Sequence, residues 1–173
     1  MPLRFRSLLA AVLFAALAPL AAAQTGLEPR FGVGFDGLLS IATGDVLEDG
    51  LGLGVRGRAS FPVNADFSIA VGGGFAGFLL GGRDDATYLF NPQLSGILTL
   101  PSSPDGARYL IGGFGGYFPT GDAAGDGGPS LHLGLGWVRP LRETSLYFEV
   151  DPSLVIGEER VALVIPGRVG VIF

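Results

Sequence analysis

The sequence predicts an all-β fold, an eight-stranded antiparallel up-and-down transmembrane β-barrel. Two observations lead to this prediction. Along most of the chain, large apolar residues alternate with polar residues or glycine, and 30 of the 173 residues are glycine. A repeat of two residues is that of a β-strand whose two faces meet different surroundings. The last such stretch, residues 161–173, alternates up to the phenylalanine at position 173.

The first 23 residues have the three parts of a secretory signal peptide. Arg4 and Arg6 precede an apolar run over residues 8–20, and three alanines follow that run. This order is typical of a segment that is removed during export, and the run is too short for a membrane-spanning helix. We therefore expect residues 1–23 to be cleaved and residues 24–173 to form one barrel domain.

Eight segments of the remaining chain alternate over roughly ten to thirteen residues, which is the length that a tilted membrane strand needs. An even number of strands lets both ends of a closed barrel lie on the same side of the membrane. The eight predicted strands are residues 30–41, 51–61, 67–80, 88–100, 108–118, 130–139, 145–155 and 161–173.

The first four segments differ in how clear their polar face is. In the first, Phe31 and Val33 share one face and Asp36 lies on the other; in the second, leucine and valine oppose glycine and arginine. A contrast of this kind excludes a strand that is buried on both faces. The third segment is rich in glycine. The fourth carries its polar face on Asn91, Gln93, Ser95 and Thr99.

The last four segments repeat the pattern. The fifth combines glycine with aromatic residues, and the sixth alternates leucine and tryptophan with serine, histidine and glycine. The seventh alternates leucine, phenylalanine and valine with tyrosine, glutamate, aspartate and serine. The eighth is the stretch that reaches Phe173. Three of the eight contain an internal proline, at Pro92, Pro152 and Pro166, and since proline removes a ladder hydrogen bond we expect β-bulges there.

The connections between the segments also alternate in character. Residues 62–66, 102–107 and 140–144 are compact turn sequences. The connections between them are acidic, and they span residues 42–50, 81–87, 120–129 and 156–160. If the chain enters from the periplasm, the compact turns are periplasmic and the acidic connections face outward.

This orientation places several aromatic residues together near the membrane boundaries, where aromatic side chains gather. On the apolar face, the outer rim receives Tyr88, Phe90 and Tyr117. The predicted girdle at the periplasmic rim consists of Phe31, Phe61, Phe67, Tyr109, Trp137 and Phe173.

Together, the signal peptide, the eight alternating strands, the aromatic rims and the final phenylalanine resemble the small outer-membrane β-barrel proteins of the OmpA, OmpX and OmpW type. The resemblance covers residues 24–173 and is architectural. It implies a location in the bacterial outer membrane, contact with outer-membrane lipid, and assembly by the barrel assembly machinery, with Phe173 as part of the assembly signal. Because the last predicted strand ends at Phe173, we do not expect the peptidoglycan-binding domain of longer relatives. The oligomeric state stays open.

Charge and composition exclude several functions. The chain has no cysteine, which rules out thiolate metal sites and cysteine catalysis. Its 11 basic residues are all arginine and are outnumbered by 16 acidic residues, so nucleic acid is not an expected partner. Two stretches, residues 32–37 and 52–57, match a dinucleotide fingerprint, but both lie inside predicted strands with no following helix. We expect no cofactor and no metal.

Other polar residues have the types found in catalytic or cation-binding sites. Ser130, His132 and Glu149 have the residue types of a hydrolase, but lipid A deacylases carry their histidine before the serine, whereas here the order is reversed. A hydrogen-bonded interior histidine is the favoured interpretation. The acidic pairs Asp84–Asp85 and Asp122–Asp126 match no defined cation-binding loop, so we expect solvated loop tips.

The strongest expectation for the interior is a charge network. Arg168 should lie between Glu149 or Asp151 on one side and Asp36 on the other, because closure makes their strands neighbours and their heights along the strands agree. Charges withdrawn into a barrel must be paired. The expected network consists of Asp36, Arg56, Arg58, Glu149, Asp151 and Arg168.

The sequence therefore favours a structural or surface-interaction protein, not an enzyme, whose interior is largely filled by side chains. A narrow channel or a conduit for a small hydrophobic molecule is the alternative, because inner-face glycines could leave a cavity. A lipid-modifying enzyme comes third, and a soluble lipocalin-like barrel with its apolar face inward remains open. The expected inner-face glycines are Gly72, Gly74, Gly112, Gly116, Gly134 and Gly136.

Overall fold

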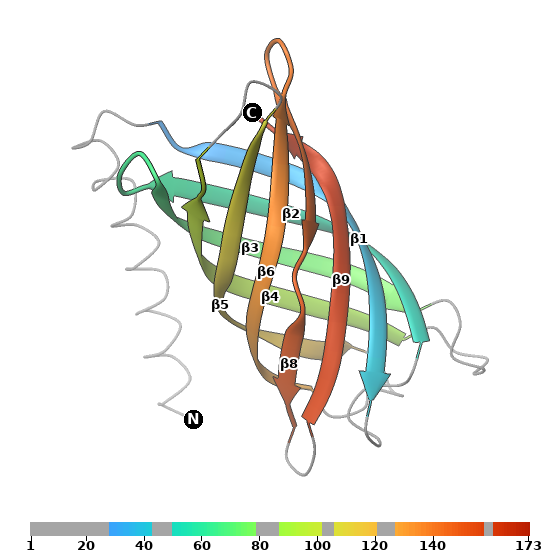
Figure 1. The fold of residues 1–173 in the computed structure, drawn as a ribbon. Helices are drawn as coiled ribbons and strands as arrows, with labels where there is room; N and C mark the ends of the chain where they lie inside the picture. The colour runs from blue at the N-terminus through green and yellow to red at the C-terminus, as the bar shows by residue number, and fades with distance from the viewer. Residues whose placement is uncertain (1–27, 43–49, 79–86, 102–105, 121–126, 158–160) are drawn as a thin grey trace, which may run out of the picture.

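The computed structural model describes residues 28–42, 50–78, 87–101, 106–120, 127–157 and 161–173. The predicted signal peptide therefore lies outside the described residues, as does most of each acidic connection. The regular structure is entirely β (Figure 1). The strands are β1 (Arg30–Ala42), β2 (Gly50–Pro62), β3 (Phe67–Phe78), β4 (Thr87–Thr99), β5 (Ala107–Thr120), β6 (Gly128–Pro140), β7 (Ser145–Val150), β8 (Ser153–Ile156) and β9 (Val161–Ile172).

The sheet closes on itself. From β1 to β7 each strand pairs antiparallel with the next, β7 and β8 both pair with β9, and β9 pairs with β1 from Gly32↔Ile172 to Ala42↔Ala162. The segments β7 and β8 are two parts of one barrel strand, since both pair with β6 on one side and with β9 on the other. The predicted eight-stranded antiparallel barrel is confirmed.

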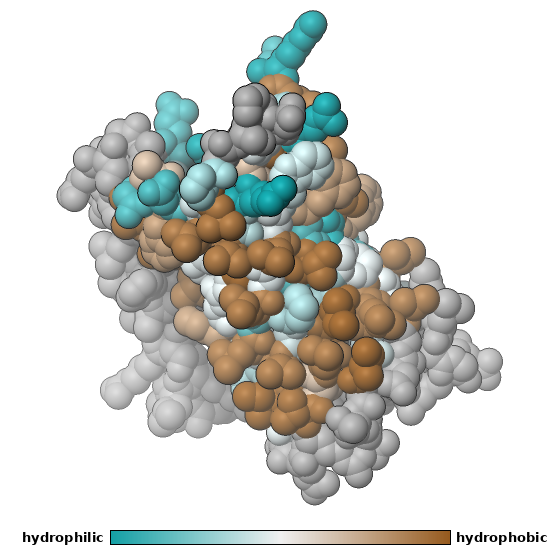
Figure 2. Space-filling model, in the orientation of Figure 1, coloured by the Kyte–Doolittle hydropathy of each residue, from teal (hydrophilic) through white to brown (hydrophobic). Residues whose placement is uncertain are grey.

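The outer surface of the barrel is apolar. Side chains alternate along β6, where every second residue from Pro129 to Trp137 is exposed and apolar, and Leu133 has 71% of its surface exposed. Figure 2 shows hydrophobic side chains spread over the wall, with hydrophilic groups gathered at the end that carries the β6–β7 turn. A closed barrel with an apolar outside is stable in a bilayer and not in water. The soluble lipocalin-like alternative, which needs the opposite arrangement, is therefore wrong.

The two ends of the barrel follow from the order of the strands. The β2–β3 and β6–β7 turns and Phe173 lie at one end, drawn uppermost in Figure 1. We call it the periplasmic end, following the orientation predicted from the sequence. Among the residues that the structure describes, no helix is long and apolar enough to cross a membrane.

The aromatic residues at the two ends agree only in part with the predicted girdle. Trp137 faces outward at the periplasmic end and stacks on Phe148, with ring centroids 5.8 Å apart. At the outer end, Tyr88 stacks on Phe75 at 5.7 Å. Outward positions at the periplasmic end are also held by Phe31, Phe61, Phe67 and Phe173.

Two tyrosines were assigned to the wrong face. Tyr109 and Tyr117 are buried inside the barrel, because the inward positions of β5 are the odd-numbered ones. The same correction applies to Gly112 and Gly116, which face outward: a Cβ on Gly112 would meet the lipid-facing Leu133. The glycines of β5 stand on both faces, so the alternation of residue types did not reveal which face was inward.

The expectation of β-bulges at the three prolines is wrong. On each side of Pro92 and Pro152 the paired strands advance by the same number of residues, and Pro166 pairs with Leu38 in an unbroken register. Each proline leaves out one backbone hydrogen bond of the strand pair, and neither strand contains the extra residue that a β-bulge would need. The nearby carbonyls still find donors: Asn91 Nδ2 donates to Gly116 O at 2.8 Å, and the backbone N–H of Asp151 donates to Pro166 O at 3.1 Å.

Glycines inside the barrel let polar side chains lie flat across a neighbouring strand. Gly136 pairs with Tyr109 on one side and with Glu149 on the other, and the Tyr109 hydroxyl donates to Glu149 across it at 2.8 Å. An added Cβ on Gly136 would overlap the Tyr109 ring. Gly113 stands in the same way between Ser95 and His132.

This arrangement predicts a position-specific cost for alanine. Gly136→Ala should lower the free energy of unfolding by roughly 1–3 kcal/mol, because the tyrosine must leave its place over the backbone. Gly57→Ala is the matched control, since a Cβ there meets nothing within 4 Å. Urea unfolding in lipid vesicles measures both. Equal effects of the two substitutions would contradict the packing described here.

Candidate functional site: the polar layer inside the barrel

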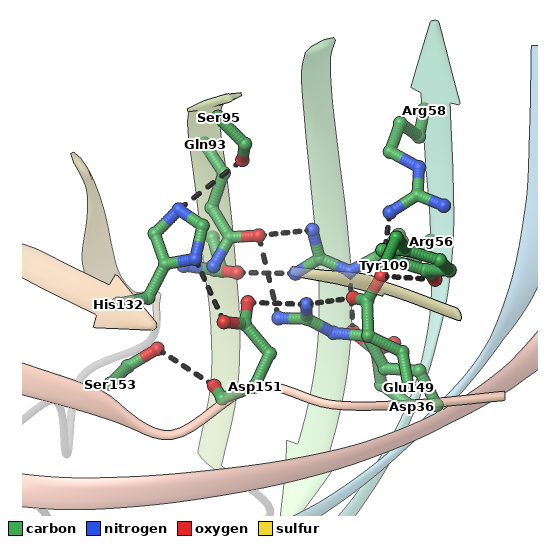
Figure 3. A network of polar contacts seen from close by, with 12 residues as sticks. Asp36, Arg56, Arg58, Gln93, Ser95, Tyr109, His132, Glu149, Asp151 and Ser153 are labelled. Carbon is green, nitrogen blue, oxygen red and sulfur yellow. Dashed lines mark hydrogen bonds and ion pairs between the residues drawn. The ribbon is translucent and has the colours of Figure 1, made fainter. Parts of the chain in front are cut away.

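The six residues of the predicted charge network lie together in the middle of the barrel (Figure 3). Arg168 Nη1 contacts Glu149 Oε1 at 2.5 Å and Asp151 Oδ2 at 2.6 Å, and its Nε lies 3.6 Å from Asp36 Oδ1. Arg168 thus stands between the two acidic sides, as expected. Arg56 Nε pairs with Asp36 Oδ2 at 3.0 Å, and Arg58 Nη1 pairs with Glu149 Oε2 at 2.7 Å.

The charges of this network balance. Three arginines face three carboxylates, and all but the half-buried Arg58 are buried, with Asp151 fully enclosed. Taking an ion out of water costs several kcal/mol, which a close partner with good hydrogen bonds offsets. Each carboxylate has at least one arginine within 3.0 Å. Mutual neutralisation is what allows so many charges to be enclosed by a barrel wall whose outside is lipid.

The network extends to neutral residues that the sequence reasoning did not include. Arg56 Nη2 donates to Asn91 Oδ1 at 2.5 Å, and its Nη1 donates to Gln93 Oε1 at 2.7 Å. The strand between them contributes Gly74, over which the Arg56 side chain lies. The polar face of the fourth predicted strand was visible in the sequence. The signal that links this polar face to Arg56 is Gly74, because a glycine between the two strands leaves room for the arginine side chain to reach across.

A second hydrogen-bonded chain runs through His132. Its Nδ1 lies 2.9 Å from Asp151 Oδ1, and its Nε2 lies 3.2 Å from Ser95 Oγ. A carboxylate accepts only, so Nδ1 carries the proton, and in the neutral ring Nε2 then accepts from the Ser95 hydroxyl. The residue types weighed from the sequence, Ser130 and Glu149, are not the partners of His132.

The order Ser95–His132–Asp151 is that of a nucleophile, a base and an orienting carboxylate. Catalysis also needs room for a substrate beside the nucleophile and donors for a developing oxyanion. The Ser95 side chain is buried. Ser95, His132 and Asp151 thus have the residue types and the order of a triad, but all three are buried.

The layer towards the outer end is mostly apolar, with the buried Ser40 and Ser130 beside its apolar members. It forms the hydrophobic core of the molecule, and its members come from β1, β3, β4, β5, β8 and β9 near their outer ends. It consists of Leu38, Ala76, Leu89, Tyr117, Val155, Ala162 and Val164. The interior of an eight-stranded barrel is just wide enough for side chains.

Aromatic side chains cover the layer towards the periplasmic end. Tyr109 and Tyr147 are both buried, and the Arg58 guanidinium lies between their rings, 5.9 Å and 5.1 Å from the two centroids. These distances are those of cation–π contacts. The interior thus has a mostly apolar outer layer, a charged middle layer and an aromatic periplasmic layer.

Other sites considered from the sequence find no support. The two dinucleotide-like stretches lie within β1 and β2. Among the described residues, no group of three or more histidine, aspartate or glutamate side chains is placed to hold a metal ion. The acidic pairs Asp84–Asp85 and Asp122–Asp126 lie outside the described residues.

Comparison with solved structures identifies the fold. The barrel is similar to the crystal structure of Neisserial surface protein A, with a TM-score of 0.70 and 11% sequence identity over 83% of this chain and 95% of that chain. It is also similar to Ail, the attachment invasion locus protein of Yersinia pestis, with a TM-score of 0.50 and 12% identity over 84% and 97% of the two chains. At these identities the likeness concerns the fold alone.

Sequence comparison adds nothing to this: no protein-family model matches the chain, and no curated protein matches it. The fold is nevertheless that of the small outer-membrane barrels that the sequence pattern resembles. Together with the lipid-facing exterior, it places the chain in the bacterial outer membrane.

Proposed function

We propose that this chain is a structural or surface-interaction barrel of the outer membrane whose interior is closed by side chains. The observation that carries the proposal is the stacking of three layers inside the barrel. The closed β-sheet is then stabilised by lipid contact on its outer face and by ion pairs on its inner face. A barrel built in this way serves as a rigid membrane anchor for the connections at its outer end.

The surface role rests on what those connections and the similar structures offer. The outer connections carry most of the acidic residues of the chain, from Asp45 to Glu159. One similar structure is of a protein named as a surface protein, and another is of a protein named for attachment and invasion. Both names support a role at the cell surface for a barrel of this size.

The runner-up, a narrow channel or a conduit for a small hydrophobic molecule, requires a continuous path through all three layers. We expect the folded protein in planar bilayers to show no steady unitary conductance, because Leu89 and Tyr117 close the outer layer and paired charges close the middle one. An open porin reconstituted in the same way is the positive control. Reproducible ohmic steps from the purified barrel would overturn the closed interior and favour the channel.

A catalytic role is not part of the proposal. The one array with suitable residue types, Ser95–His132–Asp151, is enclosed, and Asp151 is also held by Arg168 at 2.6 Å. We infer that the array acts as a hydrogen-bonded brace between β4, β6 and the β7–β8 junction. The third sequence-based alternative, a lipid-modifying enzyme, would require a serine hydroxyl that lipid can reach from the bilayer.

We further propose that Phe173 acts during assembly. Its backbone pairs with Phe31 in both directions, at 2.9 Å and 3.0 Å, and its side chain is exposed on the lipid side. A variant ending at Ile172 should reach the outer membrane at a much lower level, whereas barrels refolded from urea should keep most of their stability. Quantitative immunoblots of outer-membrane fractions and unfolding curves measure the two effects. Wild-type membrane levels of the shortened chain would refute this role.

A further inference from the structure

Two arginines point into the lipid-facing surface instead of the interior. Arg108 alternates with the buried Tyr109 near the start of β5, and Arg139 follows the outward Trp137 near the end of β6. Both are exposed, and neither forms an ion pair with any residue in the described part of the chain. They differ in this from Arg56, Arg58 and Arg168, which are paired inside.

Their spacing brings the two charges together. Arg108 pairs with Trp137 across β5 and β6, and Arg139 follows Trp137 by two residues on the same face, so the two arginines are diagonal neighbours. Such neighbours are about 7–8 Å apart at the backbone. Two like charges at this spacing repel each other, and an anion between them removes the repulsion. Arginine side chains are long enough to converge on one phosphate group.

The surroundings define the rest of the ligand. Trp137 is stacked on Phe148 with rings 20° from parallel. Because Trp137 pairs with Arg108, this flat aromatic surface lies beside the arginines at the periplasmic boundary of the apolar surface. Towards the middle of the membrane, the same face continues with the exposed Leu110, Leu133 and Leu135. A molecule that fits has an anionic head at the boundary and an apolar chain along the strands.

We propose that Arg108, Trp137 and Arg139 form a binding site for the phosphate headgroup of an anionic phospholipid in the periplasmic leaflet. The two guanidinium groups hold the phosphate, and an acyl chain lies on the leucines of β5 and β6. The assignment rests on the transmembrane position of the barrel and on its orientation. It is independent of whether the interior is closed.

Trp137 is the only tryptophan of the chain and reports on this site directly. The folded protein is placed in vesicles of neutral phosphatidylcholine containing a minor fraction of phosphatidylglycerol, and one of the two lipids carries brominated chains that quench indole fluorescence. For the wild type we expect phosphatidylglycerol to be enriched around Trp137 about fivefold or more over the bulk, the effect of one arginine near an anionic lipid surface. The Arg108→Gln/Arg139→Gln double variant should lose most of this enrichment.

Arg142→Gln is the matched control, because Arg142 is an exposed arginine of the β6–β7 turn and lies outside the site. It should keep the wild-type enrichment. Equal quenching by the two lipids in the wild type, enrichment that persists in the double variant, or its loss on adding excess inorganic phosphate would each overturn the lipid site. Absence of quenching by either lipid would overturn the membrane position of this face as well, which separates the two failures.

Discussion

Glu149→Gln should lower the free energy of unfolding of the barrel by roughly 3–5 kcal/mol, the largest effect we expect from a conservative substitution. The Glu149 carboxylate accepts hydrogen bonds from Arg58 at 2.7 Å, from Arg168 at 2.5 Å and from Tyr109 at 2.8 Å. The amide keeps the shape of the side chain but removes the charge. Arg58 and Arg168 then lose a negatively charged partner inside the barrel.

A double-mutant cycle isolates the pair. Arg168→Met alone removes a positive charge from Glu149, Asp151 and Asp36. In the double variant a negative charge is removed as well, so the combined loss of stability should be smaller than the sum of the two single losses. We expect a coupling energy above about 1 kcal/mol, measured from urea unfolding in lipid vesicles. Glu149→Gln combined with Arg139→Gln is the control, since Arg139 points away from the interior, and this pair should be additive within roughly 0.5 kcal/mol. Additivity of the Glu149–Arg168 pair would remove the network as a source of stability.

Leu133→Arg should cost about 2–4 kcal/mol, because the side chain lies near the middle of β6 and faces the centre of the bilayer. A charged group there must be withdrawn from water without a partner. Leu141→Arg is the matched control. Leu141 is an exposed leucine of the periplasmic β6–β7 turn, and the same substitution at this position should change stability by less than roughly 0.5 kcal/mol.

The adjacent position distinguishes the two faces without a charge. Cysteine at position 133 should react with a lipid-phase label, whereas cysteine at position 134 should be protected, since a Cβ on Gly134 would lie 2.5 Å from Val150 O and 2.6 Å from Asp151 Cα inside the wall. Equal labelling at the two positions would contradict the assignment of the faces, and with it the expected cost of Leu133→Arg.

A period of two reveals the lipid-facing side of a strand only where its two faces differ in residue type. Strands such as β6 and β9 carry large apolar residues on one face and small or polar residues on the other, and their faces were assigned correctly. In β5, tyrosine, isoleucine and glycine share the inward face while leucine, phenylalanine and glycine share the outward one. Both faces are then apolar, so Tyr109 and Gly112 were assigned to the wrong sides.

The charge network was predictable for the same reason. A charged residue on the inward face of a closed barrel must meet another within reach. Arg168 pairs directly with Glu149 and Asp36, and Arg56 lies diagonally, two residues from the position opposite Asp36. The partners of His132 were not predictable in this way. Ser95 lies two strands away, and its contact with His132 depends on the absence of a side chain at Gly113 between them.

The sequence by itself determined the number of strands, their order, the lipid-facing side of most of them and the members of the charge network. These properties follow from local alternation and from closure, which together leave few arrangements open. Only the tertiary structure decided how the three prolines fit without bulges, which residues lie across each glycine, and that Ser95, His132 and Asp151 form one hydrogen-bonded chain. Those outcomes depend on the register between strands and on side chains that reach across a neighbouring strand, and neither is encoded in the alternation of a single segment.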